Sequence, residues 1–550
     1  MTSVNTNFKN KLQNYDYKSL FMFLISILAG VGGALGFYLT GTRDSDYLWH
    51  VVLSDYILEN GALPIQDYFS WRSVEMGYVE TAHSWLGSLV LGLSIRFLHN
   101  LGIPMFFCSF VFAAFWYVVM CIIVKKLFYP RKADGFFFLI CVSLRFAYTH
   151  ARMHNMSYIL FVLMLFILLD IKKNVKSDKC FMLPFITVLC ANLHGGVLIL
   201  FLGVMLVFTI LLLVPDFEFG VLKHTCDHSY NGLVFKKMLV CTIVSFLFGC
   251  LNPYGIKLYS YFTHLSNDDF NALYVGEWMS VKSTNVIFLL MIAVMISFAF
   301  FKNVKIDFIT YGMVFGFTLF SLKHSRFLLY ALFSAIPLFV SYYEYYAVYL
   351  ESQLLKEKPI NDNRLVLSDD VIKKRLKMLN IYTILLSFFA VLGILGFNIY
   401  EKRHDFVESD VTTVVVPGDQ IVDTEVSDID TFDEILSPRL VTYLHDNDYK
   451  RLFCSYDIGG RLIYFGFQSF VDSRADLFVN GEMSDMICML DSLVSANITD
   501  QILAKYQFDG LIFEANRWYG FENYLASRDD WVLDYADKQY VVYKFVGSYE

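Results

Sequence analysis

The chain has 550 residues, of which 56% are hydrophobic and 17% are charged, and it contains 54 Phe and 36 Tyr. This composition excludes an ordinary soluble enzyme and is typical of a multi-pass membrane protein with aromatic side chains at its membrane interfaces. Residues 401–550 carry 28 acidic and 12 basic side chains, whereas residues 1–400 carry 24 acidic and 32 basic ones. A basic membrane half followed by an acidic tail predicts two domains and argues against nucleic acid as a partner.

Residues 1–400 contain a series of apolar segments that are long enough, or almost long enough, to cross a bilayer. They lie near 18–40, 84–99, 103–124, 134–149, 154–170, 180–195, 196–215, 237–251, 284–301, 307–322, 326–345 and 379–398. We therefore predict a polytopic α-helical membrane domain over residues 1–400, with about 11–12 transmembrane helices.

Clusters of Lys and Arg predict which ends of these segments face the cytoplasm, because such clusters stay on the inner side of the membrane. The clusters are Lys125-Lys126 with Arg131-Lys132, Lys172-Lys173 with Lys176, Lys236-Lys237, Lys302 with Lys305, and Lys373-Lys374-Arg375 with Lys377. The last cluster precedes the final segment. The tail is therefore expected on the extracytoplasmic side of a plasma membrane that the chain crosses many times.

Twelve full crossings would return the tail to the inside, so one of the segments must not cross. Segment 84–99 is short and carries Arg96 and His99, which makes it the first candidate. The alternative is that 180–215 forms one broken helix. The sequence leaves both alternatives open.

The same orientation places several short polar motifs at the outer ends of the segments. They are His150-Ala151-Arg152-Met153-His154-Asn155, Asn192-Leu193-His194-Gly195-Gly196, Asn252-Pro253-Tyr254-Gly255, Gly276-Glu277-Trp278 and His324-Ser325-Arg326. Each motif alone is typical of a turn or of an interfacial residue. Their convergence on one face predicts an outward-facing site.

Residues 41–83 form a long first outer loop, in which Asp44, Asp46 and His50 follow directly on the first apolar segment. Residues 47–58 have helical character. Acidic side chains at a membrane boundary are functional candidates, although a solvated helix end is the simpler interpretation. A long, acid-bearing connection exceeds what a connector needs, which favours a functional loop.

The tail divides into an acidic, weakly patterned linker over 401–437 and a compact α/β domain over 438–550. Its pattern predicts a helical stretch over 483–506 and strands at 451–456, 462–465, 510–513, 531–535 and 540–545, the last two as a hairpin. The cluster Asp472-Ser473-Arg474-Ala475-Asp476 could bind a ligand, but a structural ion pair is the favoured interpretation.

Motifs in both halves of the chain occur in a recognisable order. The first loop contains Asp44-Ser45-Asp46-Tyr47-Leu48-Trp49-His50, Gly61-Ala62-Leu63-Pro64 and His83-Ser84-Trp85-Leu86, and the tail contains Tyr456-Asp457-Ile458-Gly459-Gly460, Val471-Asp472-Ser473-Arg474-Ala475-Asp476-Leu477 and Asp530-Trp531. Together with the outer motifs above, they resemble bacterial polytopic membrane proteins of the GT-C glycosyltransferase-like class. The departure is conservative: Tyr47-Leu48-Trp49 stands where the class has a second Trp beside Trp49.

The resemblance implies a glycosyltransferase that takes a sugar from a polyprenyl-phosphate-linked donor, with an acid of the first outer loop as the catalytic element. A carboxylate can take the proton of the attacking hydroxyl, so Asp44 is the first choice of base and Asp46 the second. Departure of the lipid phosphate needs positive donors. The candidate substrate-binding and donor-binding residues are Arg43, His50, Asp67, His83, Arg152, His154, His194, Glu277, His324 and Arg326.

No spacing demands a metal, and Asp44, Asp46 and His50 are the expected ligands if a divalent ion such as Mg²⁺ or Mn²⁺ binds. The expected partners are membrane lipid, the polyprenyl-phosphate sugar donor, and a glycan, lipid or protein acceptor of the cell envelope. Two alternatives remain: a non-catalytic protein of the same fold that acts in assembly or recognition of a cell-surface glycan, and a transporter of lipid-linked saccharides. The transporter is disfavoured because we find no internal repeat and the polar motifs lie at one face.

Overall fold

The computed structural model describes residues 17–40, 45–79, 81–128, 140–141, 144–148, 150–174, 176–219, 222–224, 231–265, 278–282, 285–297, 306–340, 435–478, 480–491, 495–515 and 517–549. Three predicted site residues, Arg43, Asp44 and Glu277, lie outside these ranges. The final apolar segment 379–398 and the linker 401–437, except its last three residues, also lie outside them.

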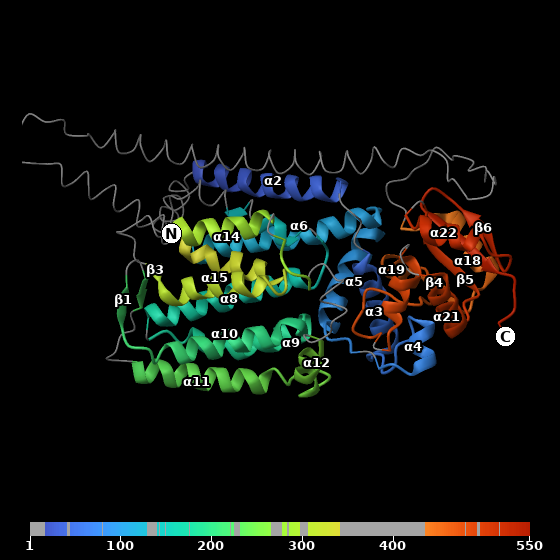
Figure 1. Ribbon diagram of the computed structural model, residues 1–550. Helices are drawn as coiled ribbons and strands as arrows, with labels where there is room; N and C mark the ends of the chain where they lie inside the picture. The colour runs from blue at the N-terminus through green and yellow to red at the C-terminus, as the bar shows by residue number, and fades with distance from the viewer. Residues whose placement is uncertain are drawn as a thin grey trace, which may run out of the picture.

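A bundle of apolar helices makes up the larger part of the described chain (Figure 1). Its members are α2 (Tyr17–Thr40), α6 (Met105–Phe128), α8 (His154–Lys173), α9 (Leu183–Leu193), α10 (Leu198–Leu211), α11 (Asn231–Phe248), α14 (Val286–Ser297), α15 (Phe308–Ser321) and a helix over Phe327–Val340. Among the described residues, α6 and α8 are long and apolar enough to cross a membrane, and five further apolar helices are shorter.

The bundle is apolar both inside and outside. Phe161, Phe201 and Phe333, from three different helices, are fully buried in its core. On its outer surface Leu28 is 68% exposed and Phe185 is 64% exposed. A helix that is apolar on all sides either lies in the core of a large protein or faces lipid.

The helices α9 and α10 run in opposite directions and do not form one broken helix over 180–215. Their contacts with α11 and the residues just after it give the directions: Phe185 with Phe248, Asn192 with Leu251, and Thr209 with Thr242. From Phe185 to Asn192 the contacts move toward the C-terminal end of α11, so α9 runs parallel to α11. From Asn192 to Thr209 they move back toward its N-terminal end, so α10 runs antiparallel to it. The reversal takes place at the short 3₁₀ helix η3 (Gly195–Val197).

The helices α3 (Asp46–Asn60) and α5 (Trp85–Asn100) pack side by side at one end of the bundle, as the helical pattern of residues 47–58 predicts for α3. Their approach is close, because a Cβ atom at Gly92 of α5 would lie 2.3 Å from the Cβ of Ser54. Figure 1 places both helices between the bundle and the C-terminal region.

Arg96 of α5 contacts both α3 and the C-terminal region. Its guanidinium forms an ion pair with Asp55 of α3 and donates a hydrogen bond to the Tyr464 hydroxyl of the C-terminal region. Segment 84–99 thus belongs to the layer between the two regions. That segment 84–99 does not cross the membrane stays a prediction.

The C-terminal region is an α/β domain around a four-stranded sheet of order β4-β5-β7-β6. Its elements are α18 (Pro438–Asn447), β4 (Leu452–Cys454), α19 (Tyr456–Tyr464), α20 (Glu482–Leu490), α21 (Ala496–Tyr506), β5 (Gly510–Glu514), α22 (Tyr519–Ala526), β6 (Trp531–Ala536) and β7 (Tyr540–Phe545). β4 and β5 are parallel, and β7 is antiparallel to both β5 and β6. The predicted central strand and final hairpin are therefore confirmed.

The strand predicted at 462–465 is wrong, because these residues end helix α19. Ile458 and Leu462 are both fully buried, and their spacing of four residues is that of one helical face. A short apolar run does not distinguish a strand from the end of an amphipathic helix.

The first outer loop enters the C-terminal domain. Its short helix α4 (Trp71–Met76) begins at Ser70, whose hydroxyl accepts a hydrogen bond from the backbone of Ser73. The Trp71 ring is buried in the core of the C-terminal domain, and its Nε1 donates to the carbonyl of Leu452 on β4 at 3.1 Å. The loop and the tail therefore share one hydrophobic core.

The end of the bundle opposite to the C-terminal domain carries the small sheet β1 (Phe217–Phe219), β2 (Leu222–His224) and β3 (Ile306–Asp307) (Figure 1). Three ion pairs join Lys172 to Asp307, Lys179 to Asp170, and Lys237 to Asp178. Members of two predicted cytoplasmic clusters thus lie together at this end.

Candidate functional site

Asp46 lies in the first turn of α3, where a carboxylate interacts favourably with the helix dipole. Its Oδ1 accepts hydrogen bonds from Trp49 Nε1 at 2.9 Å and from the Ser473 hydroxyl at 2.5 Å. Its Oδ2 lies 3.6 Å from Nε of Arg152, a residue that comes two positions before the first residue of α8. Asp46 is therefore held by the loop, the bundle and the C-terminal domain at once.

The beginning of α3 is held against the C-terminal domain by a pair of glycines in α19. A Cβ atom at Gly460 would lie 2.9 Å from the carbonyl oxygen of Ser45, and one at Gly459 would lie 2.2 Å from the carbonyl oxygen of Val471. The Ser45 hydroxyl donates to the carbonyl of Asp457 at 2.9 Å. Only residues without a side chain permit this approach, which explains the Gly459-Gly460 motif.

Three histidines from separate motifs come together, and one of them, His154, follows Arg152 by two residues. The rings of His154 and His194 lie 4.0 Å apart, and those of His83 and His194 lie 6.1 Å apart. The backbone N–H of Gly195 donates to the carbonyl of His83 at 3.0 Å, which ties the first loop to the turn between α9 and α10. The predicted convergence of the outer motifs is thus seen at this end of the bundle.

Arg326 extends this cluster. Its Nη2 lies 2.9 Å from Nε2 of His154, and its guanidinium stacks 4.4 Å from the centre of the Trp278 ring. Arginine only donates hydrogen bonds, so His154 accepts at Nε2 and is the neutral tautomer with its proton on Nδ1. The contact therefore leaves the positive charge of Arg326 in place.

His83 lies beside a tyrosine–carboxylate pair. The hydroxyl of Tyr261 in α12 (Lys257–Leu265) donates to the carboxylate of Asp476, and its ring lies 5.4 Å from that of His83. Burial lowers the pKa of His83 below its ordinary value, and the nearby Arg326 lowers it further, although Asp476 opposes both. His83 is therefore neutral at neutral pH.

His50 follows Asp46 by one turn of α3 and faces α5. The Ser88 hydroxyl donates to the carbonyl of Ser84, so His50 donates from Nδ1 to the Ser88 oxygen at 2.8 Å. Its ring lies against that of Trp49, tilted by 31°, with centroids 3.7 Å apart. His50 thus supports the ring that binds Asp46.

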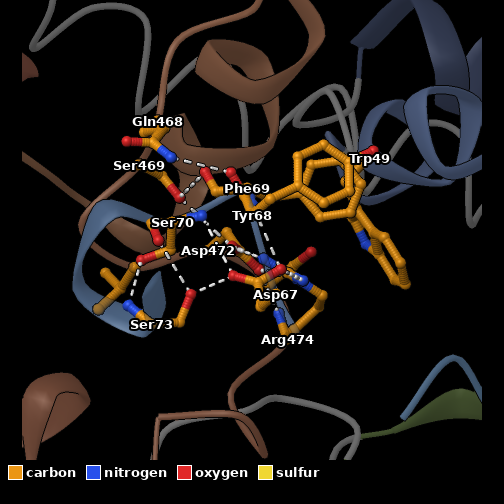
Figure 2. Close-up of polar contacts among 12 residues, drawn as sticks. Trp49, Asp67, Tyr68, Phe69, Ser70, Ser73, Gln468, Ser469, Asp472 and Arg474 are labelled. Carbon is orange, nitrogen blue, oxygen red and sulfur yellow. Dashed lines mark hydrogen bonds and ion pairs between the residues drawn. The ribbon is translucent and has the colours of Figure 1, made fainter. Parts of the chain in front are cut away.

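Asp67 belongs to a buried ionic network instead of the cluster around Asp46 (Figure 2). Arg474, which is 5% exposed, forms ion pairs with the fully buried carboxylates of Asp67 and Asp472. Asp67 also accepts from the Ser73 hydroxyl and from the backbone of Ser70. The ion-pair interpretation of the 472–476 cluster is confirmed, with Asp67 as an additional partner.

His324 and Asn192 serve as anchors of the backbone. His324 donates from Nδ1 to the carbonyl of Trp278 at 2.7 Å, which holds the ring beneath Arg326. Asn192 accepts from Trp85 and donates to the carbonyl of Leu251. These contacts fix the loops that carry the histidine cluster.

The predicted residues therefore form two linked groups, Asp46 with Arg152, and Arg326 with the histidine cluster. Three residues of these groups were not predicted as site residues: Ser88, Tyr261 and Ser473. Of the three, Ser473 belongs to a motif described from the sequence, the cluster at 472–476. Within the described ranges no three His, Cys, Asp or Glu side chains are arranged to hold a metal ion. Because Asp44 lies outside those ranges, the metal set that includes it stays a prediction.

No protein-family model matches the chain, and no curated protein matches it in sequence. Two solved structures of the oligosaccharyltransferase of Archaeoglobus fulgidus are similar to it. The one tethered to an acceptor peptide with the NVT sequon has a TM-score of 0.50 at 12% identity, covering 96% of this chain and 74% of that one. The complex with an inhibitory peptide and a dolichol-phosphate has a TM-score of 0.51 at 10% identity, covering 90% of this chain and 69% of that one. The similarity shows that the chain shares the fold of these oligosaccharyltransferase structures, which is the GT-C-like fold that the sequence motifs implied.

Proposed function

We propose that this chain is a membrane glycosyltransferase that transfers a sugar from a polyprenyl-phosphate-linked donor to a hydroxyl or amide acceptor on the outer face of the plasma membrane. The observation that carries the proposal is the carboxylate of Asp46 beside Arg152, at the end of an apolar bundle that has this fold.

The apolar exterior of the bundle supports a multi-pass membrane protein. If α5 stays at the surface, the other predicted segments make about eleven crossings, which puts the tail opposite to the N-terminus. The lysines that pair at the far end then face the cytoplasm. Asp46, Arg152 and the C-terminal domain lie on the outer side.

The chemistry needs a base near the acceptor. The acceptor oxygen or nitrogen attacks the anomeric carbon, the bond from that carbon to the phosphate oxygen breaks, and the carboxylate takes the acceptor proton. Because Oδ1 of Asp46 accepts two hydrogen bonds, Oδ2 is the oxygen suited to this role. Asp44, two residues earlier, is the general base that the sequence favours, so it is tested together with Asp46.

The leaving phosphate needs positive donors that stabilise the developing charge. Arg152 and Arg326 supply guanidinium groups, and the Nδ1–H of neutral His154 is a further donor. One structural neighbour was solved with a dolichol-phosphate and an inhibitory peptide, which supports a lipid-phosphate donor for the same fold. The acceptor stays open between glycan, lipid and protein.

The test uses the purified full-length chain in nanodiscs with undecaprenyl phosphate carrying radiolabelled glucose, mannose or N-acetylglucosamine, and a cell-envelope extract as acceptor. Release of undecaprenyl phosphate and transfer of label are both measured. Asp44→Asn and Asp46→Asn are compared with Glu59→Gln, which removes an exposed acid from the other end of α3. Loss of a general base is expected to lower turnover by about 10²–10⁴-fold, whereas Glu59→Gln should keep full turnover.

If both aspartate variants retain full transfer, the assignment of the base is wrong. If the wild type binds undecaprenyl phosphate but releases no sugar from any of the three donors, the non-catalytic alternative replaces the transferase. Movement of intact labelled donor between leaflets, without release of phosphate, would identify a transporter.

A further inference from the structure

The segment Asp472–Asp476 of the C-terminal domain touches the bundle side of the molecule at two separate places. Ser473 donates its hydroxyl to Oδ1 of Asp46 at 2.5 Å. Asp476, three residues later, accepts from the hydroxyl of Tyr261 in α12. One short stretch of tail therefore contacts Asp46 and also Tyr261, the tyrosine whose ring lies beside His83.

The residue between these two contacts is a buried anchor. Arg474 donates from its backbone N–H to Oδ1 of Asp472 at 2.9 Å and from Nε to the same oxygen at 2.8 Å. Its other end pairs with Asp67 of the first loop and lies 5.4 Å from the Trp49 ring (Figure 2). The backbone at Ser473 is thus fixed relative to α3 by buried ion pairs on either side.

We infer that Ser473 is a positioning residue of the proposed transferase, through which the C-terminal domain completes the site around Asp46. The inference rests on the proposed function. The two donors on Oδ1, Trp49 from one turn along α3 and Ser473 from the tail, fix the rotation of the carboxylate and direct Oδ2 toward Arg152. The tail then takes part in the reaction through the Ser473 hydroxyl alone, and it does not need to contact the sugar donor.

The hydroxyl also favours the ionised carboxylate, since a hydrogen bond to the charged form stabilises that form. Charged and titratable side chains also lie on the three segments that meet at Asp46. They are His50 on α3, Arg152 just before α8 and His154 at its start, and Asp457, Asp472 and Arg474 in the tail. Replacing Ser473 changes none of these charges, so a shift in pH dependence would report the hydroxyl itself.

The experiment measures turnover against pH for Ser473→Ala and Ser473→Thr in nanodiscs, with the undecaprenyl-phosphate sugar that the wild type uses. Ser527→Ala is the matched control, because this exposed hydroxyl of the same domain donates to a carbonyl three residues away, that of Tyr524. For Ser473→Ala we expect kcat to fall by about tenfold or more with little change in KM, because one hydrogen bond to a charged group is lost. The acid limb of the pH profile should move up by roughly one pH unit, and Ser473→Thr should restore both.

Two results would overturn the inference. One is wild-type kcat and an unmoved acid limb for Ser473→Ala. The other is a loss of turnover together with a lowered unfolding temperature and weaker binding of undecaprenyl phosphate, which is the pattern of a structural defect. If Asp46→Asn abolishes transfer while Ser473→Ala does not affect it, only the inference fails. If Asp46→Asn keeps full transfer, the proposed role of Asp46 fails, and the inference fails with it.

Discussion

The helical bundle and the C-terminal domain follow opposite rules for what they expose and what they bury. The bundle exposes large apolar side chains on most of its helices, among them Leu28, Phe115, Phe185, Leu206, Ile243 and Phe320. In the described part of the C-terminal domain, the exposed large apolar side chains are Ile498, Tyr519, Val532 and Val546. The domain instead buries charge, in the network of Arg474 with Asp67 and Asp472.

This difference is what two solvents would produce. A surface that faces lipid gains nothing from charge, whereas a surface that faces water gains nothing from large apolar groups. Asp46, Arg152 and the histidine cluster lie at the boundary between the two regions, where neither rule applies. Polar side chains can meet there without being fully solvated or fully excluded from water, which suits a site that handles a lipid with a charged headgroup.

Removing the buried arginine should cost the most. Arg474→Met leaves the carboxylates of Asp67 and Asp472 buried without their cation, and we expect unfolding to become easier by about 3–5 kcal/mol. Because the network joins the first loop to the tail, hydrogen exchange should rise in both α4 and β4 of the full-length protein. Thermal unfolding in detergent measures the loss.

Arg528→Met is the control for this change. Arg528 pairs with Asp500 and Asp530 in the same domain but is partly exposed, so its removal should cost about 1 kcal/mol or less. Equal losses for the two variants would show that the Arg474 network is an ordinary surface contact.

A charge on the outer face of the bundle tests the lipid-facing interpretation. Leu206 lies on α10 and is 49% exposed, and Leu206→Lys should cost about 2.5–3.5 kcal/mol if this face meets the bilayer core. Val532 on β6 is exposed to a similar degree, at 46%, and Val532→Lys should change stability by about 0.5 kcal/mol at most. Membrane insertion yield and unfolding temperature report both, and equal tolerance of the two lysines would contradict a lipid-facing α10.

A methyl group at the junction of the two regions should have an intermediate effect. Gly460→Ala adds a Cβ that would lie 2.9 Å from the carbonyl oxygen of Ser45, next to Asp46, and overpacking of this kind costs about 1–3 kcal/mol. We expect turnover to fall as well, because the start of α3 must shift. Gly312→Ala in α15 is the control, since its Cβ would meet no atom within 4 Å and should leave stability unchanged or raise it by up to about 1 kcal/mol. A Gly460→Ala protein with normal turnover would show that the position of Ser45 is not critical.

The elements could largely be predicted from local pattern, whereas the pairings could not. The period of the apolar residues identified the bundle, helix α3, the buried strand β5 and the hairpin β6–β7. It failed at 462–465, where four apolar residues are too few to show a period. The charges of Asp472 and Arg474 indicated an ion pair because the two residues are only two positions apart in sequence.

The partners from the first loop carried no such signal. Asp67 lies 407 residues from Arg474, and Asp46 lies 427 residues from Ser473. No local pattern encodes which of many carboxylates a distant arginine will meet, because that depends on how the loop folds into the tail. The same reason explains why Asp67 was grouped with the substrate-binding residues, although its contacts are those of a structural partner.

The smallest effect expected is a pH dependence of stability from His83, which lies where the two regions meet. Its pKa is lowered in the folded protein, mainly by burial, so the unfolded chain binds a proton at a higher pH than the folded one. Stability should therefore be complete above the unfolded pKa of histidine, near 6.5, and should decrease as the pH falls below that value. His83→Gln should flatten this decrease in thermal unfolding scans between pH 7 and pH 5, whereas His99→Gln, which changes an exposed histidine of α5, should leave it unchanged. If His83→Gln keeps the full decrease in stability, another group at the boundary is responsible for it. The charge of Asp476 would then offset the effect of burial on the pKa of His83 more completely than we infer.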